Sequence, residues 1–217
     1  MKPALLCSAV VAGAMFVAMR PEFAEQWTMW AVLVASYGAL GALASYRLYR
    51  TGALGECLRF RSGDMTIGIV LGLLLTGAAL VAKRVIAPAG SAPNEWLFQL
   101  YAQLGNVHKS PALVGAVAFI GLAEEVVWRG WVLRALQTDL GARRAAPLSA
   151  LAFGLAHLPT VWTLRGAAGL NPALVFASLG AGLIWAFVAT FLGRLWPVIL
   201  SHVVFSYFLA SPLSVLG

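Results

Sequence analysis

Long runs of apolar residues, separated by short polar segments, extend along the whole chain. Most runs approach the roughly 20 residues that cross the ~30 Å hydrocarbon core of a bilayer as a helix. They predict membrane spans at about 4–19, 27–46, 65–82, 111–136, 146–158, 171–192 and 196–211, of which the first and fifth are short. We therefore expect an all-α protein, a polytopic membrane helical bundle of about seven transmembrane helices, with residues 1–217 forming a single transmembrane domain.

The composition places the chain in the same class, because 61% of its residues are hydrophobic and only 11% are charged. Soluble globular domains carry about 25% charged residues. The net charge is +7, but the Lys and Arg residues are scattered through the loops and do not line one face. A membrane protein uses such residues to set its orientation, so we expect no nucleic-acid partner.

The basic residues also predict the orientation in the membrane, because seven spans place more of them on one side of the membrane than on the other. One side holds Lys2, Arg47, Arg50, Arg59, Arg61, Arg134, Arg143, Arg144 and Arg194. The other side holds Arg20, Lys83, Arg84, Lys109 and Arg165. Since basic residues are enriched on the cytoplasmic side, we expect a cytoplasmic N-terminus and a multi-pass protein of the cytoplasmic (inner) membrane.

Three weaker signals lie elsewhere in the chain. Residues 91–111 place apolar residues at helical spacing beside polar ones and predict a helix on the membrane surface, with His108 as a solvated residue. Gly68 and Gly72 have a spacing that lets two helix backbones approach closely, and we give this spacing no functional weight. The opening residues 1–19 lack a convincing cleavage site, so we expect a retained helix and no removed signal peptide.

Glu124 and Glu125 are the acidic residues that fall deep within an apolar run. Carboxylates in the membrane interior are costly, usually face the bundle interior and serve a pathway or a reaction. On a helix Glu125 and Arg129 stand at i and i+4, within ion-pairing reach, whereas Glu124 is rotated by about 100°. Glu124 is therefore the candidate general base or acid, supported by the Glu125–Arg129 pair. The alternative is a salt-bridged staple between helices without a chemical role.

His157 and His202 fall inside apolar runs on separate predicted helices. Each polar group in lipid needs a partner, and these histidines and the two glutamates can serve as each other's partners. Phe153 precedes His157 by four residues and Ser206 follows His202 by four, so each shares a helix face with its histidine. Phe153 could fix the imidazole or line a substrate slot, and Ser206 could donate a hydrogen bond. The alternative for all four residues is ordinary core packing.

Three motifs resemble, in order, those of the CAAX prenyl protease 2 family and its bacterial relatives, the CPBP or Abi-like intramembrane endopeptidases. They are "EEVVWR" (124–129), "FGLAH" (153–157) and "HVVFS" (202–206), against the family pattern EExxxR, FxxxH and Hxxx followed by Asn or Asp. The first two match in full, and the third has Ser206 at its last position. The resemblance predicts a protease core over 111–211, preceded by variable N-terminal helices over 1–110.

The resemblance implies an intramembrane endopeptidase with a polar catalytic cavity. Glu124 would activate a water with the assistance of His157, and Arg129 with Glu125 would hold their helix in shape. His202, together with the residue at position 206, would stabilise the oxyanion of the tetrahedral intermediate. Serine at 206 reaches less far than asparagine, which puts its part in this role in question.

The family has been described both as metalloproteases and as glutamate-dependent proteases. If a metal ion is present, the resemblance implies Glu124, His157 and His202 as its ligands, and zinc is the candidate metal. We favour metal-free catalysis, because no HExxH motif is present and the three side chains come from three helices.

The implied substrate is a membrane-tethered protein or peptide that enters from the lipid bilayer and is cleaved near its C-terminus or membrane anchor. Two alternatives stay open. One is a non-catalytic immunity or partner-binding membrane protein of the same fold. The other is a proton-coupled transporter, which predicts inverted repeats or broken half-helices in matching positions; the sequence shows neither.

Overall fold

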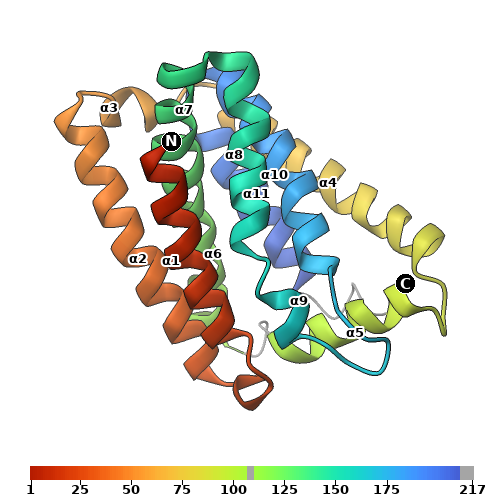
Figure 1. The fold of residues 1–217 in the computed structure, drawn as a ribbon. Coiled ribbons are helices and arrows are strands. Elements are labelled where there is room, and N and C mark those ends of the chain that lie inside the picture. The colour runs from red at the N-terminus through yellow and green to blue at the C-terminus, as the bar shows by residue number, and fades with distance from the viewer. Residues whose placement is uncertain (107–109, 211–217) are drawn as a thin grey trace.

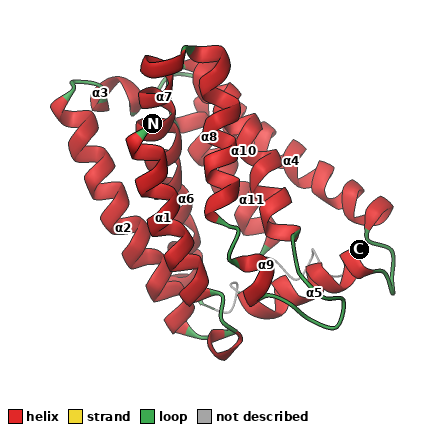
Figure 2. Ribbon diagram, in the orientation of Figure 1, coloured by secondary structure: helices red, strands yellow, loops and turns green. Residues whose placement is uncertain are grey.

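Helices account for nearly all the regular structure in the computed structural model, which describes residues 1–106 and 110–210. Figure 2 shows helices joined by loops. Within the described residues, Gly166 and Gly169 form an isolated β-bridge outside any strand. The expected all-α fold is confirmed. The elements are α1 Lys2–Ala18, η1 Pro21–Phe23, α2 Trp27–Arg50, α3 Leu54–Cys57, α4 Asp64–Ile86, α5 Ala92–Leu104, α6 Pro111–Glu125, η3 Val126–Val132, α7 Leu133–Leu140, α8 Ala142–Ala156, α9 Thr160–Thr163, α10 Ala173–Leu192 and α11 Trp196–Leu209.

Five helical stretches of the described residues are long and apolar enough to cross a membrane. They are Trp27–Arg50, Asp64–Ile86, Pro111–Leu140, Ala142–Thr163 and Ala173–Leu192. The first and seventh predicted spans correspond to the shorter apolar helices α1 and α11. The fifth span, expected to be short, extends over 22 residues from α8 into α9. The fold is therefore a polytopic helical bundle, and the total of seven spans stays a prediction.

The segment Pro111–Leu140 contacts helices on both sides of the bundle, and α1 also packs directly against α8 (Figure 1). Helices α1 and α2 pack against each other, and α2 packs against α6 and η3. On the other side, α8 packs against α10 and α7, and α11 packs against α6 and α4. Of the helices that carry the predicted motifs, α6 packs against α11, whereas α8 packs against η3 and α7, which continue from α6.

Helix α4 packs on α11 through the two glycines whose spacing the sequence showed. A Cβ atom added at Gly68 would lie 2.6 Å from Cβ of Leu200, and one added at Gly72 would lie 2.8 Å from Cβ of Val204. The glycines thus let the two backbones approach more closely than any larger residue would allow. This close contact holds the helix that carries His202.

Helix α5 runs across one end of the bundle, at a steep angle to the helices above it (Figure 1). Its buried Gln103 donates hydrogen bonds to the carbonyl oxygens of Ala18 and Arg20, at 3.3 and 3.2 Å. Asn171, before α10, donates to the carbonyl of Trp96 at 2.9 Å. The helix predicted over 91–111 corresponds to α5, which ends at Leu104. His108 lies outside the described residues.

The opposite end of the bundle gathers the N-terminus, α3, the end of α7 and the turn between α10 and α11 (Figure 1). The N-terminal ammonium pairs with Asp139 at 2.6 Å, and Arg194 pairs with the buried Asp64 at 2.7 Å. The N-terminus and Arg194, which the sequence assigned to the same side, thus lie at the same end of the bundle. Which end faces the cytoplasm stays a prediction.

Candidate active site

Glu124 and Glu125 are the last two residues of α6, and the helix continues as a π-helix over Val126–Val132 before α7 begins. A π segment inside an α-helix is rare and is frequently found at functional sites, because it redirects the side chains that follow. Both carboxylates and Arg129 are almost completely shielded from solvent, with exposed fractions of 6%, 0% and 2%. The three charges predicted in the apolar run are therefore buried within the bundle.

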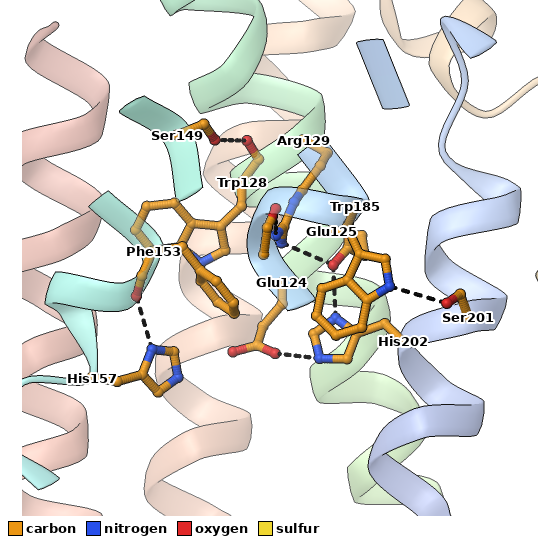
Figure 3. Close-up of polar contacts among 11 residues, drawn as sticks. Glu124, Glu125, Trp128, Arg129, Ser149, Phe153, His157, Trp185, Ser201 and His202 are labelled. Atoms are coloured by element: carbon orange, nitrogen blue, oxygen red, sulfur yellow. Dashed lines mark hydrogen bonds and ion pairs between the residues drawn. The ribbon is translucent and has the colours of Figure 1, made fainter. Parts of the chain in front are cut away.

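The buried charges form a continuous chain of polar contacts across three elements (Figure 3). Arg129 Nη1 donates to Glu125 Oε1 at 2.9 Å, as the i, i+4 spacing predicted. The same oxygen lies 2.7 Å from His202 Nδ1, and His202 Nε2 lies 3.1 Å from Glu124 Oε2. His202 of α11 therefore bridges the two glutamates of α6.

A count of charges shows which protonation state of His202 the buried cluster requires. With Arg129 charged and both glutamates ionised, the cluster is neutral only when His202 carries a proton on each ring nitrogen. An unpaired charge is costly in a low-dielectric interior, so neutrality is strongly favoured. One proton is then shared between His202 and Glu124. Glu124 has no cationic partner on its own helix, as expected, and finds one on α11.

Aromatic rings lie against the two cationic side chains of this chain of polar contacts. Trp185 of α10 stacks on His202, with ring centroids 4.0 Å apart and an interplanar angle of 19°, and its Nε1 donates to Ser201 Oγ at 3.0 Å. The Arg129 guanidinium lies over the ring of Phe153, 4.7 Å from its centroid, and Nη2 donates to the carbonyl of Gly182 at 3.0 Å. These contacts fix the orientation of both cationic side chains.

His157 follows the last residue of α8 and has its tautomer set by the backbone. Its Nδ1 lies 2.8 Å from the carbonyl oxygen of Phe153. A carbonyl only accepts, so Nδ1 carries the proton and Nε2 of the neutral ring keeps its lone pair. In Figure 3 the Glu124 carboxylate lies between the rings of His157 and His202. The structure therefore brings Glu124, His157 and His202 into one site, with Phe153 against the His157 ring at 4.8 Å between centroids.

Ser206 does not take part in this chain of polar contacts. Among the described residues its hydroxyl makes no hydrogen bond, and both ring nitrogens of His202 are engaged by carboxylates. The roles expected of Ser206 and His202 toward an oxyanion stay predictions. A cavity of about 190 Å³ opens between the start of α7 and the end of α10 and is lined by Arg129 but by none of the other predicted site residues.

Sequence reasoning missed two aromatic residues of this site. Trp185 stacks on His202, and Tyr37 of α2 lies fully buried and close enough to Glu124 to interact with it electrostatically. Both occur in apolar runs where an aromatic side chain is unremarkable, so composition and spacing gave no signal for either. A search of the apolar runs for side chains with a polar tip is the signal that could have found them.

The donor set does not fit a zinc ion as it stands. Within residues 1–106 and 110–210, no group of three or more His, Cys, Asp or Glu side chains is arranged to hold a metal ion. Glu124 and His202 are turned toward each other, and His202 Nδ1 is engaged by Glu125. We therefore derive no step through a metal.

A bundle of long apolar helices with a buried Glu, Arg and His cluster defines a multi-pass membrane protein with an intramembrane polar site. Residues 106–208 match the family described as type II CAAX prenyl endopeptidase, Rce1-like, so this segment is similar to that family of proteases. The match contains all three motifs and overlaps the predicted core. No curated protein and no solved structure matches the chain.

Proposed function

We propose that this chain is an intramembrane endopeptidase in which Glu124 activates the attacking water. The observation that carries the proposal is the position of the Glu124 carboxylate, buried in a membrane helix between two histidines from other helices. Oε2 is paired with His202, and among the described residues Oε1 has no hydrogen-bond partner. Glu124 Oε1 and His157 Nε2 are thus two acceptors that a water can bridge.

The chemistry follows from the protonation states argued above. Glu124 takes a proton from the water as the hydroxyl oxygen adds to the carbonyl carbon of the scissile peptide bond. The carbonyl becomes a tetrahedral oxyanion. The proton on Glu124 then passes to the leaving nitrogen as the C–N bond breaks, which releases an amine and a carboxylic acid that ionises in water. His202 balances the charge on Glu124, and Glu125 with Arg129 holds His202 in place.

We propose a membrane-tethered protein or peptide as the substrate, cleaved near its C-terminus or membrane anchor. The family match supports a lipid-anchored CAAX-type C-terminus as the first probe. The nearly complete burial of the site supports entry from the lipid by movement of the surrounding helices. We further propose the cytoplasmic membrane as its location.

The test uses purified protein in proteoliposomes with an internally quenched, farnesylated CAAX-type peptide and a palmitoylated peptide of unrelated sequence. We expect the wild type to cleave at least one, with both fragments identified by mass spectrometry. Glu124→Gln should lower kcat by about 10²- to 10⁴-fold, the range for loss of a general base. The control is Glu56→Gln, since Glu56 lies exposed on α3. Equal cleavage by both variants would refute the role of Glu124.

Metal-free catalysis is tested on the same preparation. We expect activity to persist after prolonged treatment with EDTA and with 1,10-phenanthroline, with less than one zinc per ten proteins by elemental analysis. Activity that is lost on chelation and restored by zinc would contradict this part of the proposal.

A further inference from the structure

Unpaired buried polar atoms concentrate around the site. Among the described residues, five buried side-chain nitrogen or oxygen atoms lack a hydrogen-bond partner: Tyr37 Oη, Trp96 Nε1, Glu125 Oε2, Trp128 Nε1 and Arg129 Nε. All except Trp96 belong to the charged chain or its surroundings. Buried polar groups in native structures are rarely left unpaired, and those that are often have a chemical role.

Tyr37 is the unexpected member of this set, because it comes from α2 and lies outside the matched residues 106–208. The buried stripe of α2 contains Met29, Trp30, Leu33, Tyr37, Leu40, Ala44 and Leu48. Its other members pack as ordinary core residues, whereas Tyr37 brings a hydroxyl into a membrane helix. Burying a hydroxyl without a partner costs about 1–3 kcal/mol by mutational measures, so packing alone does not explain it.

Two glycines bring this hydroxyl to the site. Gly38 and Gly41 face α6, where a Cβ atom would lie 3.5 Å from Cζ of Phe119 and 3.4 Å from Cβ of Ala123. Ala123 directly precedes Glu124, so α2 contacts α6 beside the glutamate. Tyr37 interacts electrostatically with Glu124, Trp128 and Arg129.

The neighbours of Tyr37 fix the direction of its proton. The indole of Trp128 only donates, so it can give its proton to Tyr37 Oη but cannot accept one. Arg129 likewise only donates. Glu124 is the acceptor among these neighbours. Among these neighbours, the single hydroxyl proton of Tyr37 can therefore be accepted only by the Glu124 carboxylate.

We infer that Tyr37 is a positioning residue that donates a hydrogen bond to Glu124 in the reacting enzyme, with Trp128 donating in turn to Tyr37. The inference rests on the proposed function and extends it to the N-terminal half of the chain. The hydroxyl holds the carboxylate in the orientation that presents Oε1 to the water and stabilises its ionised form. The other charged or titratable groups around Glu124 are Glu125, Arg129, His157 and His202.

The test compares Tyr37→Phe with Tyr49→Phe, which removes an exposed hydroxyl from the same helix. In the proteoliposome assay we expect Tyr37→Phe to lower kcat by about 10- to 100-fold with KM within about threefold, because it removes a bond to a charged group. The acidic limb of the pH–rate profile should move to higher pH, since ionised Glu124 loses a donor. Tyr49→Phe should behave as the wild type.

Stability separates positioning from packing. Because the hydroxyl has no hydrogen-bond partner among the residues that the structure describes, Tyr37→Phe should melt at the wild-type temperature or higher. A variant that fails to fold or melts markedly lower would overturn the inference, since the hydroxyl would then be a structural bond. If the wild type is active and Tyr37→Phe has the same kcat and pH profile, the inference about Tyr37 is wrong. The proposed function would then still stand.

A readout independent of proteolysis covers the case in which no peptide is cleaved. The chain has three histidines, so ¹³C-histidine NMR in detergent resolves each ring, with assignment by His108→Gln, His157→Gln and His202→Gln. Because Tyr37 interacts electrostatically with Glu124, the partner of His202, Tyr37→Phe should shift the His202 signals and their titration and leave those of His108 unchanged. Absence of cleavage would count against the proposed function, whereas unchanged His202 signals would count against the role of Tyr37.

Discussion

Arg129 makes the contacts on which the geometry of the site most depends. It donates to Glu125 and to the carbonyl of Gly182 on α10, and its guanidinium lies between the rings of Phe153 and Trp185. A guanidinium suits this place because its planar fork donates in several directions at once and stacks on aromatic faces. One side chain thus joins η3, α8 and α10.

We expect Arg129→Met to destabilise the protein by about 3–5 kcal/mol, because it leaves the Glu125 charge buried without its partner. Arg134→Met is the control, since partly exposed Arg134 makes one hydrogen bond, to the carbonyl of Gly193, and should cost about 1 kcal/mol. Unfolding by titration with SDS in a fixed detergent measures both. Equal losses would show that Arg129 does not hold the site together.

For individual residues, the sequence predicted side-chain contacts within one helix better than contacts between helices. The i, i+4 spacing of Glu125 and Arg129 was sufficient for their ion pair, because helix geometry is known in advance. The bridge that His202 makes between the two glutamates depends on how α11 packs on α6, and no spacing encodes it. The same applies to Tyr37, whose place depends on the approach of α2.

The packing of α4 depends on single residues. It packs on α11 through Gly68 and Gly72 and leaves most of its remaining surface outward, including Leu74, Val81 and Val85. Because α11 carries His202, the contact between these two helices also positions the site.

We expect Gly72→Leu to separate α4 from α11 and to reduce both thermal stability and proteolytic activity, because the new side chain would overlap Val204 and the carbonyl of Ser201. Gly77→Leu is the matched control on the same helix, since a Cβ atom there would meet nothing within 4 Å. Melting curves and the peptide assay measure the outcome. Similar behaviour of the two variants would mean that the close contact does not matter.

The helices themselves were predictable, because a bilayer requires long apolar runs and each predicted span corresponds to an observed helix. Two local features were not. The π segment Val126–Val132 depends on how the helix fits between its neighbours, and α5 ends at Leu104, where Gly105 adopts a φ of 65°. The first has no pattern of its own, and for the second the predicted range ran past Gly105, although glycine commonly follows the end of a helix.

For the whole molecule, the basic residues predict that the end with the N-terminus faces the cytoplasm. Arg143 and Arg165 offer a direct test, since both are exposed and lie near opposite ends of the Ala142–Thr163 span. The native Cys7 and Cys57 are buried, and burial raises the pKa of the Cys57 thiol, so both react slowly. Replacing them with Ala gives a clean background.

In intact cells a membrane-impermeant maleimide should label Arg165→Cys and should label Arg143→Cys only after permeabilisation. The reverse pattern would invert the orientation, and labelling of both without permeabilisation would show that this segment does not span.

The central claim is that Glu124 makes this protein a protease, and the most direct measurement is the set of membrane-protein termini in cells. Cells that lack the gene would be complemented with the wild type, Glu124→Gln or Glu56→Gln at matched protein levels, and their termini compared by mass spectrometry. We predict truncated termini with the wild type and Glu56→Gln that are absent with Glu124→Gln. Identical termini in all strains, or truncation that persists with Glu124→Gln, would contradict the claim.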